Sequence, residues 1–223
     1  MNISLISDIV IYSELLSAVV GSIYYAKYKQ TVLKYFLFLL WYITITELIG
    51  WYGSVNDAFG FYKDGIPYRT WLYNLLRIIT FSSLFYIYLK YLNTKIFKKW
   101  IQVFAVVYVI ISIINWIFWQ NFLFERSESP RIIGTIFIII TILFFFIELL
   151  RSDKIVVFHR MLLFWISVGL LLFYSGTIPF VLKWNGFMLI PGVHKLFLIV
   201  YILAIIMYLT FTFGFIWSKK ESH

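Results

Sequence analysis

The chain has 223 residues, of which 62% are hydrophobic and 13% charged, and its mean hydropathy is +0.90. So few polar residues cannot cover the surface of a soluble domain of this length, which excludes an ordinary globular protein. The net charge of +9 comes from basic clusters between apolar runs, a pattern typical of membrane-flanking charge and not of a nucleic-acid-binding surface. The lipid bilayer is therefore the expected partner, and nucleic acid is not.

Seven apolar runs follow one another along the chain, each near the roughly 20 residues that a helix needs to cross a bilayer. We expect transmembrane helices over residues 3–25, 35–53, 70–89, 100–119, 132–150, 161–182 and 196–217. The gaps between them are too short for a separate soluble domain. The sequence thus predicts one domain over residues 1–223, an all-α integral membrane protein with a seven-transmembrane helix bundle. Its N-terminal segment lacks a basic stretch and a small-residue cleavage site, so we expect the first helix to be retained.

The loop charges predict the orientation of the bundle, because short cytoplasmic loops are enriched in Lys and Arg. Twelve basic residues fall on one side, namely Lys27, Lys29, Lys34, Lys90, Lys95, Lys98, Lys99, Arg151, Lys154, Arg160, Lys219 and Lys220. Six fall on the other side, namely Lys63, Arg69, Arg126, Arg131, Lys183 and Lys195. We therefore expect the N-terminus outside and the C-terminus in the cytoplasm.

The two halves of the chain show a weak internal similarity. The offset that places Lys27 on Arg151 also places Trp41 on Trp165, and Ile66-Pro67 on Ile190-Pro191. It superposes the first three helices on the last three and leaves the fourth as a linker. This favours a parallel 3+1+3 repeat, a layout found among transporters.

Ionisable residues inside the predicted spans mark the candidate site, because each costs several kcal/mol in lipid unless it is compensated. Glu47 and Arg77 lie at similar depth, roughly 10 Å below the outer surface, in helices that a short loop makes neighbours. Glu14 lies near the middle of the membrane, and Asn74 lies one turn above Arg77. We expect a polar, ligand-binding pocket open to the outside, formed by Glu14, Glu47, Asn74, Arg77 and, from the fourth helix, Asn115. The alternative is that Glu47 and Arg77 only fix helix register.

Two further features are expected to shape the bundle. Glu148 lies at the inner end of the fifth helix beside Arg151 and Lys154, where we expect it to reach the interface and form an ion pair. Gly169 and Gly176 lie on one face of the sixth helix, and Pro179 follows near its outer end. Small residues allow close helix contact and proline bends a helix, so this segment is either a packing seam or a hinge beside the pocket.

Sequence motifs for common chemistries are absent. The chain has no Cys, no His-Glu-x-x-His metal motif, no Gly-x-Ser-x-Gly nucleophile elbow and no glycine-rich phosphate loop. The last span has no central Lys, which excludes a retinal protein. We therefore predict no metal, no cofactor and no catalytic residue.

Four segments, ITELIGWYG, WLYNLLR, FFFIELLRSDK and FWISVGLLLFYSGTIPF, are similar to segments of small seven-helix membrane proteins of Bacteroidota. The resemblance covers most of the chain. It implies a multi-pass protein of the bacterial inner membrane, and its association with sensor kinases implies a signalling subunit. It carries over no catalytic residue.

Three classes of function follow from these expectations. The first is a receptor-like or accessory signalling subunit, which binds a small molecule or ion from outside and acts on a cytoplasmic or membrane signalling partner. The second is a transporter or channel for a small solute or ion, favoured by the repeat and the intramembrane charges. The third is an intramembrane enzyme that modifies lipid, with Glu14 or Glu47 as acid or base. The inner halves of the second and third helices are mostly apolar, which favours the receptor-like body.

Overall fold

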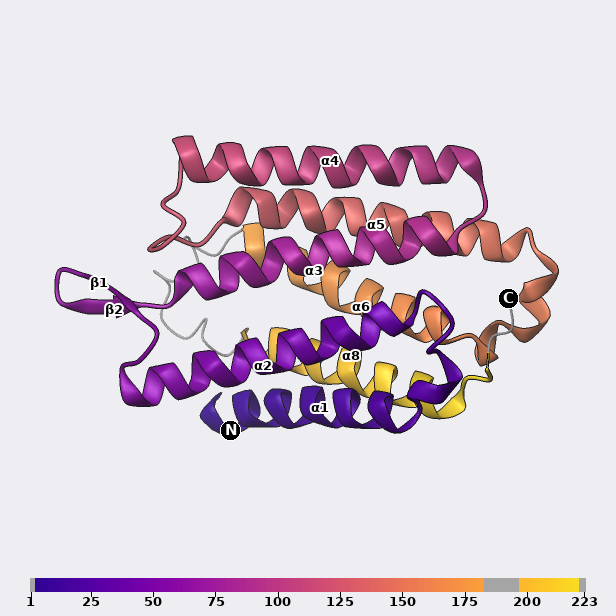
Figure 1. The fold of residues 1–223 in the computed structure, drawn as a ribbon, viewed down its shortest axis with the longest axis horizontal. Helices are drawn as coiled ribbons and strands as arrows, with labels where there is room; N and C mark the ends of the chain where they lie inside the picture. Colours follow the sequence, from indigo (N-terminus) through magenta and orange to yellow (C-terminus); the bar gives the residue numbers. More distant parts are fainter. Residues whose placement is uncertain (1–2, 183–196, 221–223) are drawn as a thin grey trace.

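The computed structural model describes residues 3–182 and 197–220, which form a bundle of long helices running side by side (Figure 1). The seven long helices in these residues are α1 (Ile3–Ile23), α2 (Lys34–Asn56), α3 (Thr70–Tyr91), α4 (Lys95–Phe118), α5 (Glu128–Leu150), α6 (Leu162–Leu182) and α8 (Phe197–Trp217). All seven are long and apolar enough to cross a membrane. The predicted all-α, seven-helix membrane bundle is confirmed. Its orientation and its internal repeat stay predictions, and Lys183, Ile190, Pro191, Lys195 and residue 196 lie outside the described residues.

The order of the helices places α4 at one edge of the bundle and α1 at the other (Figure 1). Helix α4 packs on α3 and α5, whereas α8 packs on α6 and α1. Helices α2, α3, α5 and α6 connect these two groups through α1–α2, α2–α3, α3–α5 and α5–α6 contacts. We call the end that carries the α2–α3 and α4–α5 connections the hairpin end. The opposite end, with Lys27, Lys34, Lys90 and Lys219, is the lysine end.

A short β-hairpin projects from the hairpin end between α2 and α3 (Figure 1). Strands β1 (Phe61–Lys63) and β2 (Ile66–Tyr68) pair antiparallel, with Lys63 opposite Ile66. The turn residues Asp64 and Gly65 both have positive φ angles, 53° and 76°. An Asp-Gly pair is favoured in such two-residue turns because both positions need this conformation. The hairpin was not predicted from the sequence, although the Asp64-Gly65 pair is a typical indication of such a turn.

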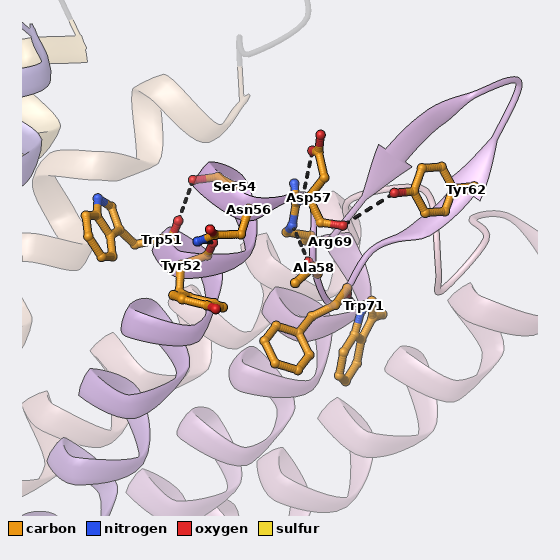
Figure 2. Close-up of polar contacts among 10 residues, drawn as sticks. Trp51, Tyr52, Ser54, Asn56, Asp57, Ala58, Tyr62, Arg69 and Trp71 are labelled. Carbon is orange, nitrogen blue, oxygen red and sulfur yellow. Dashed lines mark hydrogen bonds and ion pairs between the residues drawn. The ribbon is translucent and has the colours of Figure 1, made fainter.

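Polar contacts of Arg69 and Trp71 fix the hairpin to the helices, as Figure 2 shows. Arg69 Nε donates a hydrogen bond to the carbonyl of Ala58 at 2.9 Å, and its Nη2 lies 3.4 Å from Asp57 Oδ1. Trp71 Nε1 donates to the carbonyl of Phe59 at 3.0 Å. Helix α2 ends here because Asp57 adopts a left-handed conformation with φ of 50°. These contacts therefore hold the base of the connection against the ends of α2 and α3.

Helix α4 begins earlier than the sequence predicts because Glu148 of α5 caps its start. The backbone N–H of Asn93 donates to Glu148 Oε1 at 2.8 Å, and that of Thr94 to Oε2 at 2.9 Å. These bonds satisfy backbone donors that the beginning of a helix leaves unpaired. Glu148 forms no ion pair with Arg151, and the Lys154 side chain lies outside the part of the structure that is described.

Lys27 connects the α1–α2 loop to the end of α8 at the lysine end. Its Nζ donates to the carbonyls of Phe215, Ile216 and Ser218, at 3.3, 3.1 and 2.9 Å. A cation at a helix C-terminus satisfies carbonyls that the helix leaves unpaired and complements the helix dipole. Partial burial lowers the pKa of Lys27 below its ordinary value. This contact fixes the last turn of α8 relative to α1 and α2.

The glycines of α6 face α8. A Cβ atom on Gly169 would lie 2.8 Å from Phe211 Cε1, and one on Gly176 would lie 2.5 Å from Leu203 Cδ1. Both distances are shorter than real carbon contacts, so α6 and α8 approach this closely only because these positions carry no side chain. Helix α6 continues through the exposed Pro179 to Leu182. This geometry supports the packing-seam interpretation of these residues.

We predict that Gly169→Val destabilises the bundle, because the added methyl groups collide with Phe211 and with the carbonyl of Met207. Overpacking of this kind costs about 1–3 kcal/mol. The measurement is the midpoint of thermal unfolding in detergent, followed by tryptophan fluorescence. Leu172→Val, on the lipid-facing side of the same helix where Leu172 is 45% exposed, is the matched control and should change the midpoint little. Equal midpoints for both variants would contradict the close α6–α8 seam.

Candidate functional site: a charged cavity inside the bundle

A cavity of about 420 Å³ lies inside the bundle and is lined by side chains from α1, α2, α3, α5, α6 and α8. Two carboxylates and three guanidinium groups belong to its lining: Glu14, Glu47, Arg77, Arg126 and Arg131. This volume falls within the range of small-molecule pockets, roughly 300–1,000 Å³. Charged groups that are costly in lipid thus converge on one interior space.

The carboxylates line the α1–α2 side of the cavity. Glu14 is only 2% exposed, and its Oε1 is buried with no hydrogen-bond partner. Glu47 Oε2 accepts a hydrogen bond of 3.4 Å from the Tyr73 hydroxyl. Gly50 makes room for this hydroxyl, since a Cβ there would lie 2.5 Å from Tyr73 Oη. This side of the cavity therefore holds two carboxylates that make few hydrogen bonds to the described residues.

The guanidinium groups come from α3, from α5 and from the loop between α4 and α5. Arg77 Nη1 donates to the carbonyl of Ser127 at 3.2 Å and to Asn74 Oδ1 at 3.5 Å. Arg131 Nη1 lies 4.0 Å from Glu128 Oε2. Arg126 belongs to the loop and also lines the cavity. The basic wall is thus positioned by the start of α5 and the loop that precedes it.

Asn74 holds that loop against α3. Its Nδ2 donates to the carbonyls of Phe122 and Glu125 at 2.8 and 2.9 Å, and its Oδ1 accepts from the N–H of Ser127 at 3.2 Å. The Asn74 side chain is buried, with 1% exposure. Trp116 adds a bond from Nε1 to Ser127 Oγ at 2.6 Å. These bonds aim the Ser127 carbonyl at Arg77.

Hydroxyl groups also line the cavity. Tyr174 and Thr177 of α6, Tyr201 and Tyr208 of α8, and Thr80 of α3 line the cavity. Thr80 Oγ1 is buried without a hydrogen-bond partner. Tyr208 lies beside the Glu14 carboxyl. The cavity surface thus offers neutral donors and acceptors as well as charges.

Toward the lysine end, the cavity is closed by apolar side chains. Phe36, Leu84 and Phe211 line this part of it. Beyond them the core is fully packed, and the Tyr88 hydroxyl bonds to Ser167 Oγ at 2.7 Å between α3 and α6. Glu47, Arg77, Arg126 and Arg131 therefore lie in the half of the bundle nearer the hairpin end, and Glu14 lies near the middle of α1.

The structure distributes the predicted site residues over two locations. Glu14, Glu47 and Arg77 line one cavity, although Arg77 and Glu47 form no direct ion pair. Asn74 supports the cavity from behind through the loop. Asn115 does not line it: its Nδ2 donates to Gln120 Oε1 at 2.9 Å, at the end of α4.

Sequence reasoning missed Arg126, Arg131 and Tyr208 as cavity residues. The two arginines were assigned to an outer loop by the charge count, and Tyr208 is one of seventeen tyrosines. The available signal was the charged run from Glu125 to Arg131 immediately before the fifth apolar span. Among the described residues, no three His, Cys, Asp or Glu side chains gather as metal ligands.

The fold and this cavity define the class of the chain, a multi-pass all-α membrane protein with a charged interior. Comparisons with models of protein families, with curated proteins and with solved structures give no match. The cavity is therefore the feature on which a proposed function rests.

We predict that Asn74→Asp destabilises the protein. The substitution removes two hydrogen bonds and turns a buried carboxylate toward the carbonyls of Phe122 and Glu125, at a cost of roughly 2–4 kcal/mol. Thermal unfolding measures the loss, and protease cleavage within residues 119–127 measures release of the loop. Asn56→Asp is the matched control, because Asn56 is exposed and also donates to a backbone carbonyl. An unchanged cleavage rate in Asn74→Asp would show that Asn74 does not hold the loop.

Proposed function

We propose that this protein is a receptor-like or accessory signalling subunit that binds a small ligand in the interior cavity. The observation that carries the proposal is the convergence of Glu14, Glu47 and three arginines on one space inside the bundle. Burying these charges costs stability that a purely structural bundle would avoid. Function is the usual reason for ionisable groups at such positions.

We also propose that the ligand enters the cavity from the hairpin end and that this end faces away from the cytoplasm. The support is the excess of Lys and Arg at the lysine end and the position of most of the charged groups in the other half of the bundle. Ser82 and Ser83, the polar residues of α3 beyond Thr80, line a separate groove between α2 and α3 with Tyr35 and Tyr86. They do not extend the cavity toward the lysine end.

Helix α8 supplies the connection that a receptor needs. Tyr201 and Tyr208 line the cavity, and the last carbonyls of the same helix accept hydrogen bonds from Lys27 at the lysine end. A ligand that moves α8 would therefore move the basic loop between α1 and α2. This loop is the surface we propose for contact with a cytoplasmic or membrane signalling partner.

A transporter is the second candidate, supported by the same intramembrane charges. It requires that the cavity open at the lysine end in another conformation. The packed layer around Tyr88 and Ser167 favours the receptor. Nothing in the site favours the enzyme, because no contact among the described residues joins Glu14 or Glu47 to a serine or threonine hydroxyl of the cavity lining.

Cysteine labelling tests the proposal, because the chain contains no native cysteine. Thr177→Cys places a thiol in the cavity, whereas Ser167→Cys places one in the packed layer below it. We predict that a membrane-impermeant maleimide labels Thr177→Cys from the hairpin side only and leaves Ser167→Cys unlabelled. Tyr62→Cys, in the exposed hairpin, reports which side the reagent reaches.

The outcomes separate the candidate functions. Labelling of Thr177→Cys from both sides would favour the transporter. No labelling from either side, with Tyr62→Cys fully labelled, would contradict a ligand-accessible cavity.

A further inference from the structure

The charges of the cavity are separated by sign. The carboxylates of Glu14 and Glu47 come from α1 and α2, and the guanidinium groups of Arg77 and Arg131 come from α3 and α5. No ion pair joins one wall to the other among the described side chains. The cavity therefore presents an acidic and a basic wall to whatever occupies it.

Both walls retain unused hydrogen-bonding capacity. Among the residues that the structure describes, Glu14 Oε1 has no hydrogen-bond partner, and Glu47 has one bond, of 3.4 Å from Tyr73. On the other wall, Arg77 bonds through Nη1, so Nε and Nη2 bond to none of the described residues. A guanidinium group has five donors in a planar fork that matches a carboxylate. Thr80 Oγ1, which also lines the cavity, is another buried atom without a partner.

The net charge of the ligand decides which class fits these walls. Among the described residues, a simple anion would leave Glu14 and Glu47 without a charged partner, and a simple cation would leave Arg77 without one. A buried charge without a partner is costly because the interior has a low dielectric constant. A zwitterion compensates both walls and brings no net charge into the membrane.

From this arrangement we propose that the cavity binds a small amino acid. Its ammonium group would face Glu14 and Glu47, and its carboxylate would face Arg77 and Arg131. The inference rests on the proposed ligand-binding function and names the class of ligand. The cavity volume of about 420 Å³ accommodates a molecule of this size together with water.

Two sets of matched ligands test whether binding requires both an ammonium and a carboxylate group. Binding is measured with the protein in lipid nanodiscs. One set is γ-aminobutyrate, butyrate and butylamine, and the other is leucine, isocaproate and isoamylamine. The apparent dissociation constant is measured from the concentration dependence of thermal stabilisation. We expect at least one amino acid to bind about ten-fold or more tightly than both of its single-charge analogues, because it gains a charge-assisted hydrogen bond at each wall.

One substitution and its control test the acidic wall. Glu14→Gln should weaken binding of the amino acid about ten-fold and leave binding of its carboxylate analogue unchanged, since that analogue lacks the ammonium group. Asp57→Asn is the matched control, because this carboxylate is exposed at the end of α2 and outside the cavity lining. It should leave all affinities unchanged.

Other outcomes overturn the inference. Equal binding of the amino acid and its carboxylate analogue would mean an anion site, and equal binding of the amine would mean a cation site. Absence of binding by every compound would also reject the amino acid class. If Thr177→Cys were still labelled in that case, the accessible cavity and the proposed function would stand without this ligand. Absence of labelling would reject the proposed function itself.

Discussion

The cost of a guanidinium group inside a membrane bundle is the constraint on which the rest of this structure depends. Arg77 lies within α3, where it is compensated by the Ser127 carbonyl and by Asn74. Those partners require the loop between α4 and α5 to fold back onto α3, and the bonds from Asn74 to Phe122 and Glu125 hold it there. The compensation of one buried charge thus orders a connection and brings Arg126 and Arg131 to the same cavity.

The helices are arranged so that this polar space is surrounded by packing. Six of them line the cavity, whereas α4 packs outside on α3 and α5. Close contact between α6 and α8 depends on glycines, and the layer around Tyr88 closes the bundle toward the lysine end. Helix α8 extends from the cavity wall to the contact with Lys27. Through α8, the cavity wall is therefore connected to the lysine end of the bundle.

The spans and the buried charges could be predicted from sequence because both follow from local composition and helix length. Glu14, Glu47 and Arg77 stand out as charges within apolar runs, and all three line the cavity. That Arg126 and Arg131 line the cavity could not be predicted in this way, because a charged residue in a loop is expected to be solvated unless the loop folds inward. The same limit applies to Glu148, which caps α4 across a helix interface, and to Asn115, whose bond is local to its own helix end. Periodicity gives depth within a helix, but partners depend on how the helices pack.

The proposed receptor-like role and amino acid ligand depend on one structural claim: Glu14 and Glu47 share an interior space with Arg77 and Arg131, and no ion pair joins these four described side chains. The most direct measurement is an experimental density map of the protein in lipid nanodiscs that shows ordered solvent. The account predicts that Glu14 and Arg77 end in the same cavity, with ordered non-protein density between the two walls. A map in which either side chain faces lipid, or in which packed apolar side chains separate them, would contradict it.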